Sequence, residues 1–266
     1  MKNIAYLFLL CPIYLFSQPN CNAFLFTGDT LQYKACIEAE KAEKFYQFQR
    51  EFQETLDNAI KICPNFAYAY REKSTAYLKS GDFLTWKKLI DRAVDLDFGL
   101  NLGYRGWCRY QFFRDYKGAI EDIERLDSLA DYDIGYSTNG DYHLNITKAV
   151  CYSALNQKKK AIKIFKEQLK TKDYSPGLYD YYQLGVTYYE IKDFANALKS
   201  FEKQTEINEF ADNSYYKCKI YKILDNQKEY KKYKETALLL YAGNKKLFDP
   251  YTRHFNSVYY QTIKNE

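Results

Sequence analysis

The feature that most constrains this chain is a set of aromatic and small residues that recurs at a nearly constant spacing. Four tyrosines occupy one column of the pattern, and a tryptophan or an alanine follows each of them nine residues later. These tyrosines are Tyr77, Tyr110, Tyr152 and Tyr188, and successive members are 33, 42 and 36 residues apart. Such a period, close to 34 residues, indicates a solenoid in which each repeat is one pair of helices.

Residues 178–207 show one unit of the pattern clearly. The apolar face of its first helix carries Tyr181, Leu184, Gly185 and Tyr188, at the spacing of an amphipathic helix. Its second helix carries Ala197 and Phe201. The small residues Gly185 and Ala197 allow two antiparallel helices to cross closely, while the aromatic side chains fill the space on either side.

These residues resemble the tetratricopeptide repeat, which has aromatic, Leu, small, Tyr, Ala and aromatic residues at fixed positions, and residues 178–209 match all six. The resemblance implies an all-α, right-handed superhelical solenoid of antiparallel helix pairs. We place the repeats at 33–66, 67–99, 100–133, 142–175, 178–211 and 214–247. Trp107 stands where the family has a small residue, and an insert, Ala130–Asp141, lengthens one step. A C-terminal capping helix is expected at about 249–264.

The N-terminus has the pattern of a secretory signal peptide. Lys2 precedes the 13 apolar positions Ile4–Phe16, and the small residue Ser17 follows them. An apolar stretch this short does not comfortably cross a membrane. We therefore expect residues 1–17 to be a signal peptide, residues 18–266 to form the repeat domain, and the protein to be periplasmic or extracellular. A buried N-terminal helix and a membrane anchor, through the uncleaved segment or a lipid, are the alternatives.

Seven cysteines are present without any CxxC motif, which argues against a zinc or thioredoxin-like site. In an oxidising compartment some of them would pair. Cys36 lies near the start of one predicted helix and Cys63 near the end of its antiparallel partner. Both are thus expected at the same end of the helix pair, which makes a Cys36–Cys63 disulfide the candidate.

No catalytic or cofactor-binding motif stands out. The two histidines, His143 and His254, have no Cys, His or carboxylate at ligand spacing, and the chain has no nucleophile elbow, phosphate-binding loop, metalloprotease motif or EF-hand. We expect a non-enzymatic protein without a metal or cofactor.

Two compositional features have competing interpretations. The 29 Tyr and 18 Phe could form a stacking surface, but many tyrosines fall on the repeat columns, which favours packing between helices. The basic run Lys158–Lys172 could bind nucleic acid or an anionic membrane. A solvated helix face is favoured instead, because the net charge is only +5 and Ile162, Phe165 and Leu169 form the opposite side.

The resemblance also implies where a partner binds, because the first helices of this family line a concave groove. The expected groove residues are Arg71, Tyr104, Arg105, Tyr179, Tyr182, Gln183 and Tyr189. Tyr and Arg are common interface anchors, since they bury a large area and still form hydrogen bonds. We expect recognition of a peptide or protein partner rather than nucleic acid. The alternative is a structural or scaffold subunit of a bacterial cell-envelope assembly.

Overall fold

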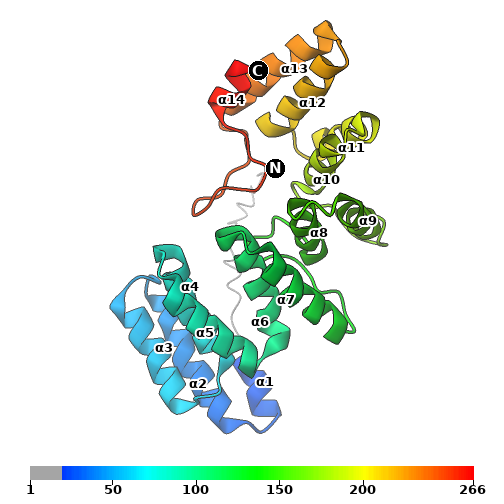
Figure 1. Ribbon diagram of the computed structural model, residues 1–266. Helices are drawn as coiled ribbons and strands as arrows, with labels where there is room; N and C mark the ends of the chain where they lie inside the picture. The colour runs from blue at the N-terminus through cyan, green and yellow to red at the C-terminus, as the bar shows by residue number, and fades with distance from the viewer. Residues whose placement is uncertain (1–19) are drawn as a thin grey trace, which may run out of the picture. The chain divides into compact units, whose positions relative to one another are not determined.

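The computed structural model describes residues 20–266, and the predicted signal peptide lies outside the described residues. Helices form the described part of the chain, with one isolated β-bridge between Tyr136 and His143. The all-α class is therefore confirmed. The helices group into two compact units, here called the N-terminal unit (residues 20–96) and the C-terminal unit (residues 97–266). Figure 1 shows the helices of each unit.

The N-terminal unit consists of helices joined by short turns. They are α1 (Cys21–Phe26), α2 (Thr30–Glu40), a 3-10 turn (Lys41–Lys44), α3 (Arg50–Ile62), α4 (Ala67–Ser80) and α5 (Phe83–Leu96). The Asp29 side chain caps α2 by accepting a hydrogen bond from the backbone N–H of Gln32. Helix α4 ends at Gly81, whose φ of 86° lies in the left-handed region that glycine adopts without strain. Helix α2 packs on α3, and α4 packs on α5.

One disulfide lies in the N-terminal unit, and it is not the one predicted from the sequence. It joins Cys21 in α1 to Cys36 in α2, with the Cα atoms 5.5 Å apart. Cys63 is a free, buried thiol in the same apolar core, so the predicted Cys36–Cys63 pairing is wrong. The cause is α1, which precedes the first predicted repeat and packs against α2, bringing Cys21 to Cys36.

The C-terminal unit contains four helix pairs and a short final helix. Its elements are α6 (Phe98–Cys108), a π-helical turn (Arg109–Phe113), α7 (Tyr116–Leu129), α8 (Leu144–Ala154), α9 (Lys158–Gln168), α10 (Asp180–Glu190), α11 (Phe194–Ile207), α12 (Ala211–Ile223), α13 (Gln227–Ala242) and α14 (Tyr260–Asn265). Within pairs, α6 packs on α7, α8 on α9, α10 on α11 and α12 on α13. Successive pairs stack through α7–α8, α9–α10 and α11–α12 contacts. Each pair therefore buries its apolar surface on its neighbours.

The turns within these pairs have a common construction. Each contains one residue with a left-handed backbone, namely Arg114, Asn156, Lys192 and Asp225. Each of them lies between the first and the second helix of its pair. In three of the four, an Asp or Asn then caps the second helix of the pair with its side chain, namely Asp115, Asp193 and Asn226.

Small residues allow the two helices of a pair to cross closely, as the sequence predicts for Gly185. A Cβ atom built on Gly185 of α10 would lie 2.4 Å from a ring carbon of Phe201 in α11. In the first pair of the unit, the close approach occurs at Gly106, whose added Cβ would lie 3.1 Å from Ile123 in α7. The neighbouring Trp107 is buried, so a large residue is tolerated one position beyond the crossing.

The C-terminal end differs from the predicted capping helix at about 249–264. Helix is present only in α14, and residues 243–259 lack regular helix. We call Leu247–Val258 the C-terminal loop. Its backbone and side chains bind other parts of the C-terminal unit, and these contacts replace the hydrogen bonds that a helix would have formed.

Candidate binding face of the C-terminal unit

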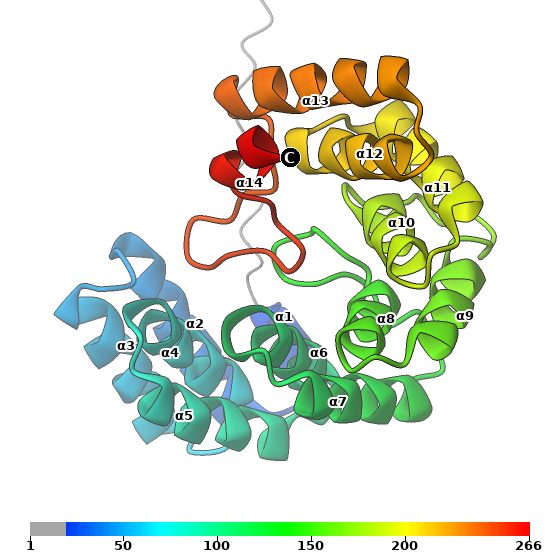
Figure 2. The same cartoon turned by 45° about the horizontal axis from the view of Figure 1, so that its top comes forward.

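The C-terminal loop lies on a face that we call the first-helix face. This face is formed by the first helices of the pairs, by the π-helical turn after α6 with the start of α7, and by the insert before α8. Figure 2 shows the loop, drawn in red, beside the green insert. The hydrogen bonds and ring contacts described below place the loop against the first, third and fourth helix pairs of the unit and against the insert before α8.

Asp212, in the first turn of α12, joins the two ends of the loop. One carboxylate oxygen accepts a hydrogen bond from the backbone N–H of Leu247 at 3.1 Å, and the other accepts one from Val258 at 2.5 Å. Asp212 is 1% exposed. Burial raises the pKa of Asp212, and the two backbone N–H donors partly offset that shift. A single side chain therefore closes the base of the loop.

Two adjacent side chains of α10 bind one dipeptide of the loop. The Tyr182 hydroxyl donates to the carbonyl oxygen of Asn256 at 2.6 Å. The Gln183 side-chain amide donates to the carbonyl oxygen of Phe255 at 3.3 Å and accepts from the Asn256 side-chain amide at 2.8 Å. Gln183 also donates to the Tyr142 hydroxyl at 3.0 Å, which fixes its orientation. Backbone and side chain of Asn256 are thus both recognised.

The tip of the loop contacts the junction between the π-helical turn and α7. The Phe255 ring packs edge-on against Tyr116, with ring centroids 5.7 Å apart, and the Arg114 guanidinium lies 5.9 Å from the Phe255 centroid. Arg114 also donates to the carbonyl oxygen of Arg253. The Thr252 hydroxyl donates to the carbonyl oxygen of Gln111 at 3.0 Å. The Phe255 ring, the Arg253 carbonyl group and the Thr252 hydroxyl group therefore hold the tip.

His254 is a loop residue whose side chain is buried. Its Nε2 atom is 3.1 Å from the carbonyl oxygen of Phe248 and 3.4 Å from an Asp141 carboxylate oxygen. Burial lowers the pKa of His254, whereas burial and the nearby Asp249 carboxylate raise the pKa of Asp141 to about 6. The histidine is therefore built into the loop as a mainly neutral hydrogen-bonding group.

The structure brings together three of the predicted groove residues and separates the others. Tyr179, Tyr182 and Gln183 all lie beneath the C-terminal loop, and the Tyr179 ring is 5.5 Å from that of His254. Tyr189 lies at the other end of α10, where its ring packs against Tyr216 at 5.2 Å. The expectation that these side chains stand on an exposed face is wrong for Tyr182 and Gln183. Both are at most 1% exposed. The loop covers them, and the Tyr182 ring also packs in the apolar core against Phe201, Phe210 and Tyr216.

The remaining predicted groove residues lie away from the loop. Arg105 forms a two-point ion pair with Asp122 of α7, with N–O distances of 2.6 and 2.9 Å, so its guanidinium joins two helices of one pair. Tyr104 is buried beside Trp107. Arg71 belongs to the N-terminal unit.

Sequence reasoning missed the loop residues Phe255 and Asn256 and their partners Arg114 and Asp212. The sequence offered one signal, since Asn256, Ser257 and Val258 have low helix propensity and argue against a continuous helix there.

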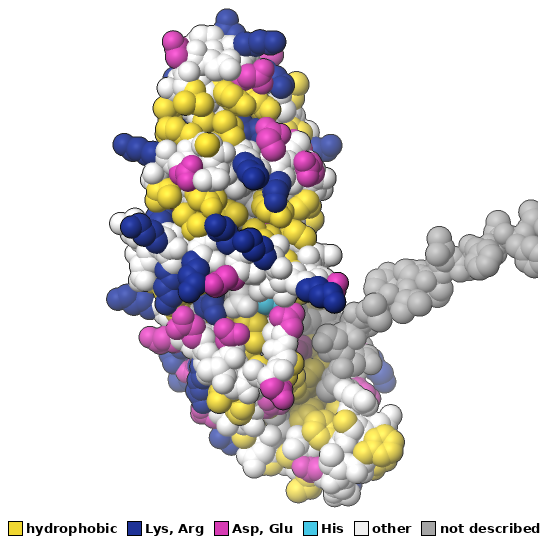
Figure 3. All heavy atoms as spheres, turned by 90° about the vertical axis from the view of Figure 1, so that its right-hand side faces the viewer, with side chains coloured by type: hydrophobic (Ala, Val, Ile, Leu, Met, Phe, Trp, Pro, Cys, Tyr) yellow, Lys and Arg dark blue, Asp and Glu magenta, His cyan; other side chains and the backbone are white. Residues whose placement is uncertain are grey.

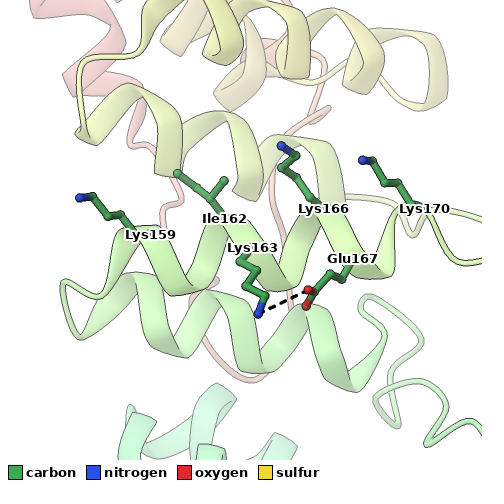
Figure 4. A pocket seen from close by; sticks show the side chains of 6 residues that line it. All are labelled: Lys159, Ile162, Lys163, Lys166, Glu167 and Lys170. Carbon is green, nitrogen blue, oxygen red and sulfur yellow. Dashed lines mark ion pairs between the residues drawn. The ribbon is translucent and has the colours of Figure 1, made fainter.

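The basic run on α9 forms a second surface feature. Figure 4 shows a shallow hollow beside α9, lined by Lys159, Ile162, Lys163, Lys166, Glu167 and Lys170. Lys163 pairs with Glu167 at 3.8 Å. Ala161 and Phe165 are fully buried on the opposite side of the helix. On the surface in Figure 3, basic side chains are interspersed with acidic and hydrophobic ones. This arrangement matches the solvated, amphipathic helix favoured by the sequence, except that Ile162, expected on the opposite side, lines the hollow with the lysines.

Within residues 20–266, Cys21, Cys36 and Glu40 are the one group whose ligand atoms lie close enough together to hold a metal ion. Because the two sulfurs are bonded to each other, they do not offer thiolate ligands. In the same range, none of the helices combines the length and the apolar character required to span a bilayer.

Comparison with known proteins gives structural matches only. No family model matches the chain, and no curated protein matches its sequence. The crystal structure of PilW, a widely conserved type IV pilus biogenesis factor, matches with a TM-score of 0.63 and 16% identity, over 78% of this chain and 94% of PilW. PilF from Pseudomonas aeruginosa matches with a TM-score of 0.56 and 14% identity, over 84% of this chain and 89% of PilF. Taken with the stacked helix pairs, these matches identify the chain as a tetratricopeptide-type repeat protein by its fold.

Proposed function

We propose that this protein is a non-enzymatic interaction scaffold that binds a non-helical segment of a protein partner on the first-helix face of its C-terminal unit. One observation carries the proposal: this face already holds a non-helical peptide segment, the chain's own C-terminal loop, which turns at Phe255 and Asn256. Tyr182 and Gln183 bind backbone carbonyl groups of the loop, and such groups are present in any peptide. Interaction through a repeat surface also fits the tetratricopeptide-type fold.

The site contains both kinds of group that peptide binding requires. Tyr182 and Gln183 supply hydrogen-bonding groups that orient a backbone, and Arg114 and Tyr116 supply a place for one aromatic side chain. Aromatic and arginine side chains of this kind commonly provide most of the binding energy of an interface. We therefore retain Tyr179, Tyr182 and Gln183 as partner-binding residues and add Arg114.

Binding of the loop sequence in trans tests this function. In the full chain, residues 249–257 are replaced by a Gly/Ser linker of equal length, which opens the face, and a fluorescein-labelled peptide of residues 247–258 is titrated by anisotropy. Saturable binding is expected, and it should weaken about tenfold when Gln183→Ala is added, as for an anchor contributing about 1–2 kcal/mol. A scrambled peptide is the control. If the opened variant retains its helical circular dichroism but binds no peptide, the proposed function is wrong.

A second candidate function, a scaffold subunit of a bacterial envelope assembly, is favoured by the Cys21–Cys36 disulfide. Disulfides persist mainly in oxidising compartments outside the cytoplasm. The apolar segment Ile4–Phe16 and the likeness to the pilus biogenesis factor PilW agree with this candidate. Mass spectrometry of the natively expressed protein should find a mature N-terminus near Gln18 in an envelope fraction. A chain that keeps Met1 and fractionates with the cytosol would exclude it.

A further inference from the structure

We propose that the C-terminal loop is an internal competitor, which keeps the first-helix face closed until a partner segment with an aromatic residue followed by a side-chain amide displaces it. This inference rests on the proposed function and adds its regulation and the chemistry of the partner. In the closed state, Phe255 and Asn256 occupy the positions that the partner would take.

The loop is placed so that it can leave while the helices beside it stay folded. It connects α13 to α14, and α14 is anchored independently: Ile263 is 1% exposed and packs in a cluster with Ala237 of α13 and Tyr215 of α12. The two ends of the loop meet at Asp212. Displacement of the segment between them therefore requires no separation of α12, α13 and α14.

The contacts of the loop are also of a kind that a second peptide can replace. The α10 and α7 groups bind the loop through two backbone carbonyls, one side-chain amide and one aromatic ring, which are those of Phe255 and Asn256. Phe255 and Asn256 are only partly buried, so the occupant is accessible to solvent along one side. A competing segment can thus gain contacts stepwise as the loop loses them.

Gln183 gives this face its selectivity for an amide side chain. Its own amide pairs with the Asn256 side chain as acceptor and with the Phe255 carbonyl as donor, and the Tyr142 hydroxyl holds it in that orientation. A buried amide left without its partner costs about 1–3 kcal/mol. A segment that lacks Asn or Gln at this position should therefore bind about tenfold more weakly than one that carries it.

A partner binds only the molecules in which the face is open, so the apparent affinity is the intrinsic affinity multiplied by the open fraction. If the loop is docked in about 99% of molecules, the apparent affinity falls about a hundredfold. Substitutions in the loop that remove its contacts, without any change to the face, should increase the apparent affinity in proportion to the open fraction.

The experiment measures the affinity of the labelled 247–258 peptide for four versions of the full chain. These are the wild type, a Phe255→Ala/Asn256→Ala variant, the linker variant described above, and a Phe248→Ala control. Phe248 is a matched control because its side chain is 62% exposed while its carbonyl still accepts from His254. Affinity should rise at least tenfold from the wild type to the double variant and rise further in the linker variant. Phe248→Ala should bind as weakly as the wild type.

The outcomes separate this inference from the proposed function. Equal binding by the wild type and the linker variant would overturn internal competition and leave the peptide-binding face intact. Absence of binding by the folded linker variant would overturn the face itself. A peptide in which the Phe255 and Asn256 positions are alanine should lose binding to the linker variant, and retained binding would overturn the aromatic–amide preference. Dimerisation of the wild type through exchanged loops, detected by sedimentation, would replace internal competition by a second copy as the occupant.

Discussion

Gly185 occupies a crossing of α10 and α11 at which even a methyl group has no room. An added Cβ would lie 2.4, 2.6 and 2.9 Å from three carbons of the fully buried Phe201 ring. Gly185→Ala should therefore lower the free energy of unfolding by about 1–3 kcal/mol through overpacking, measured by urea denaturation. Gly99→Ala in α6 is the control, because its Cβ would make only ordinary contacts at 3.5 and 3.8 Å. In Gly99→Ala, the loss of glycine flexibility should raise the free energy of unfolding by up to about 1 kcal/mol. A change of the unfolding free energy in the same direction for both variants would contradict the packing argument.

Arg105 was expected in the groove, and its ion pair gives it a structural role instead. The Asp122 side chain is 4% exposed and binds both Arg105 and Arg109, at 2.6 and 3.1 Å. Asp122→Ala should cost about 3 kcal/mol of unfolding free energy, since it leaves two arginines without their buried counter-charge. Arg50→Ala, which breaks the exposed and solvent-screened pair with Glu54, should leave the melting temperature essentially unchanged. Equal effects in thermal melts of the two variants would contradict the structural role.

Among the secondary-structure elements, α1 depends on a covalent link to α2. The Cys21–Cys36 disulfide spans 15 residues, which corresponds to about 3 kcal/mol by the loop-entropy estimate. A Cys21→Ser/Cys36→Ser variant should lose stability of that order, and a reductant should lower the melting temperature of the wild type but not of the variant. Peptide mapping under non-reducing conditions should find Cys63 as a free thiol. A Cys36–Cys63 linkage would contradict this assignment.

The elements also show what the sequence can predict and where it fails. Helix pairs were predictable because small and aromatic residues such as Gly185 and Phe201 recur within one period of the chain. The C-terminal loop was not, because its bonds join distant residues: Asn256 and Gln183 are 73 positions apart. Locally, the Asp249 side chain does accept hydrogen bonds from the backbone N–H groups of Tyr251 and Thr252, as a capping residue does at the start of a helix. Tertiary contacts of His254 and Asn256 then override that local preference.

The same distinction applies to the candidate site. The register of the repeat located Tyr179, Tyr182 and Gln183 on the first-helix face, because that position depends only on helical spacing. It could not give their exposure, because exposure depends on tertiary contacts: Tyr182 packs against Phe201 and Tyr216, and a loop that follows three helices later covers both Tyr182 and Gln183. Likewise, the disulfide prediction compared two predicted helices and omitted α1, whose six residues carry no repeat pattern.

At the scale of the whole molecule, buried carboxyl groups make the stability of the C-terminal unit depend on pH. Burial raises the pKa of Asp180 to about 6, and its bonds from the Tyr174 hydroxyl and the Gly177 N–H only partly oppose the shift. The folded state therefore holds this proton more tightly than the unfolded chain, in which the pKa is about 3.9. The stabilising contribution is complete below about pH 4 and is lost as the pH rises through about 6.

Asp180→Asn tests this dependence without a change in side-chain shape. Its amide oxygen can accept the same two hydrogen bonds, and the cost of ionising a buried group disappears. Relative to the wild type, the unfolding free energy of the variant should rise by up to about 3 kcal/mol between pH 4 and pH 7, from a shift of about two pH units. Asp141, His143 and His254 contribute equally to the pH dependence of both proteins, so their contributions cancel in the difference between the two unfolding free energies. Asp225→Asn removes the same charge at an exposed, left-handed turn and should give no such rise. A pH-independent difference between Asp180→Asn and the wild type would show that Asp180 carries no raised pKa in the folded chain.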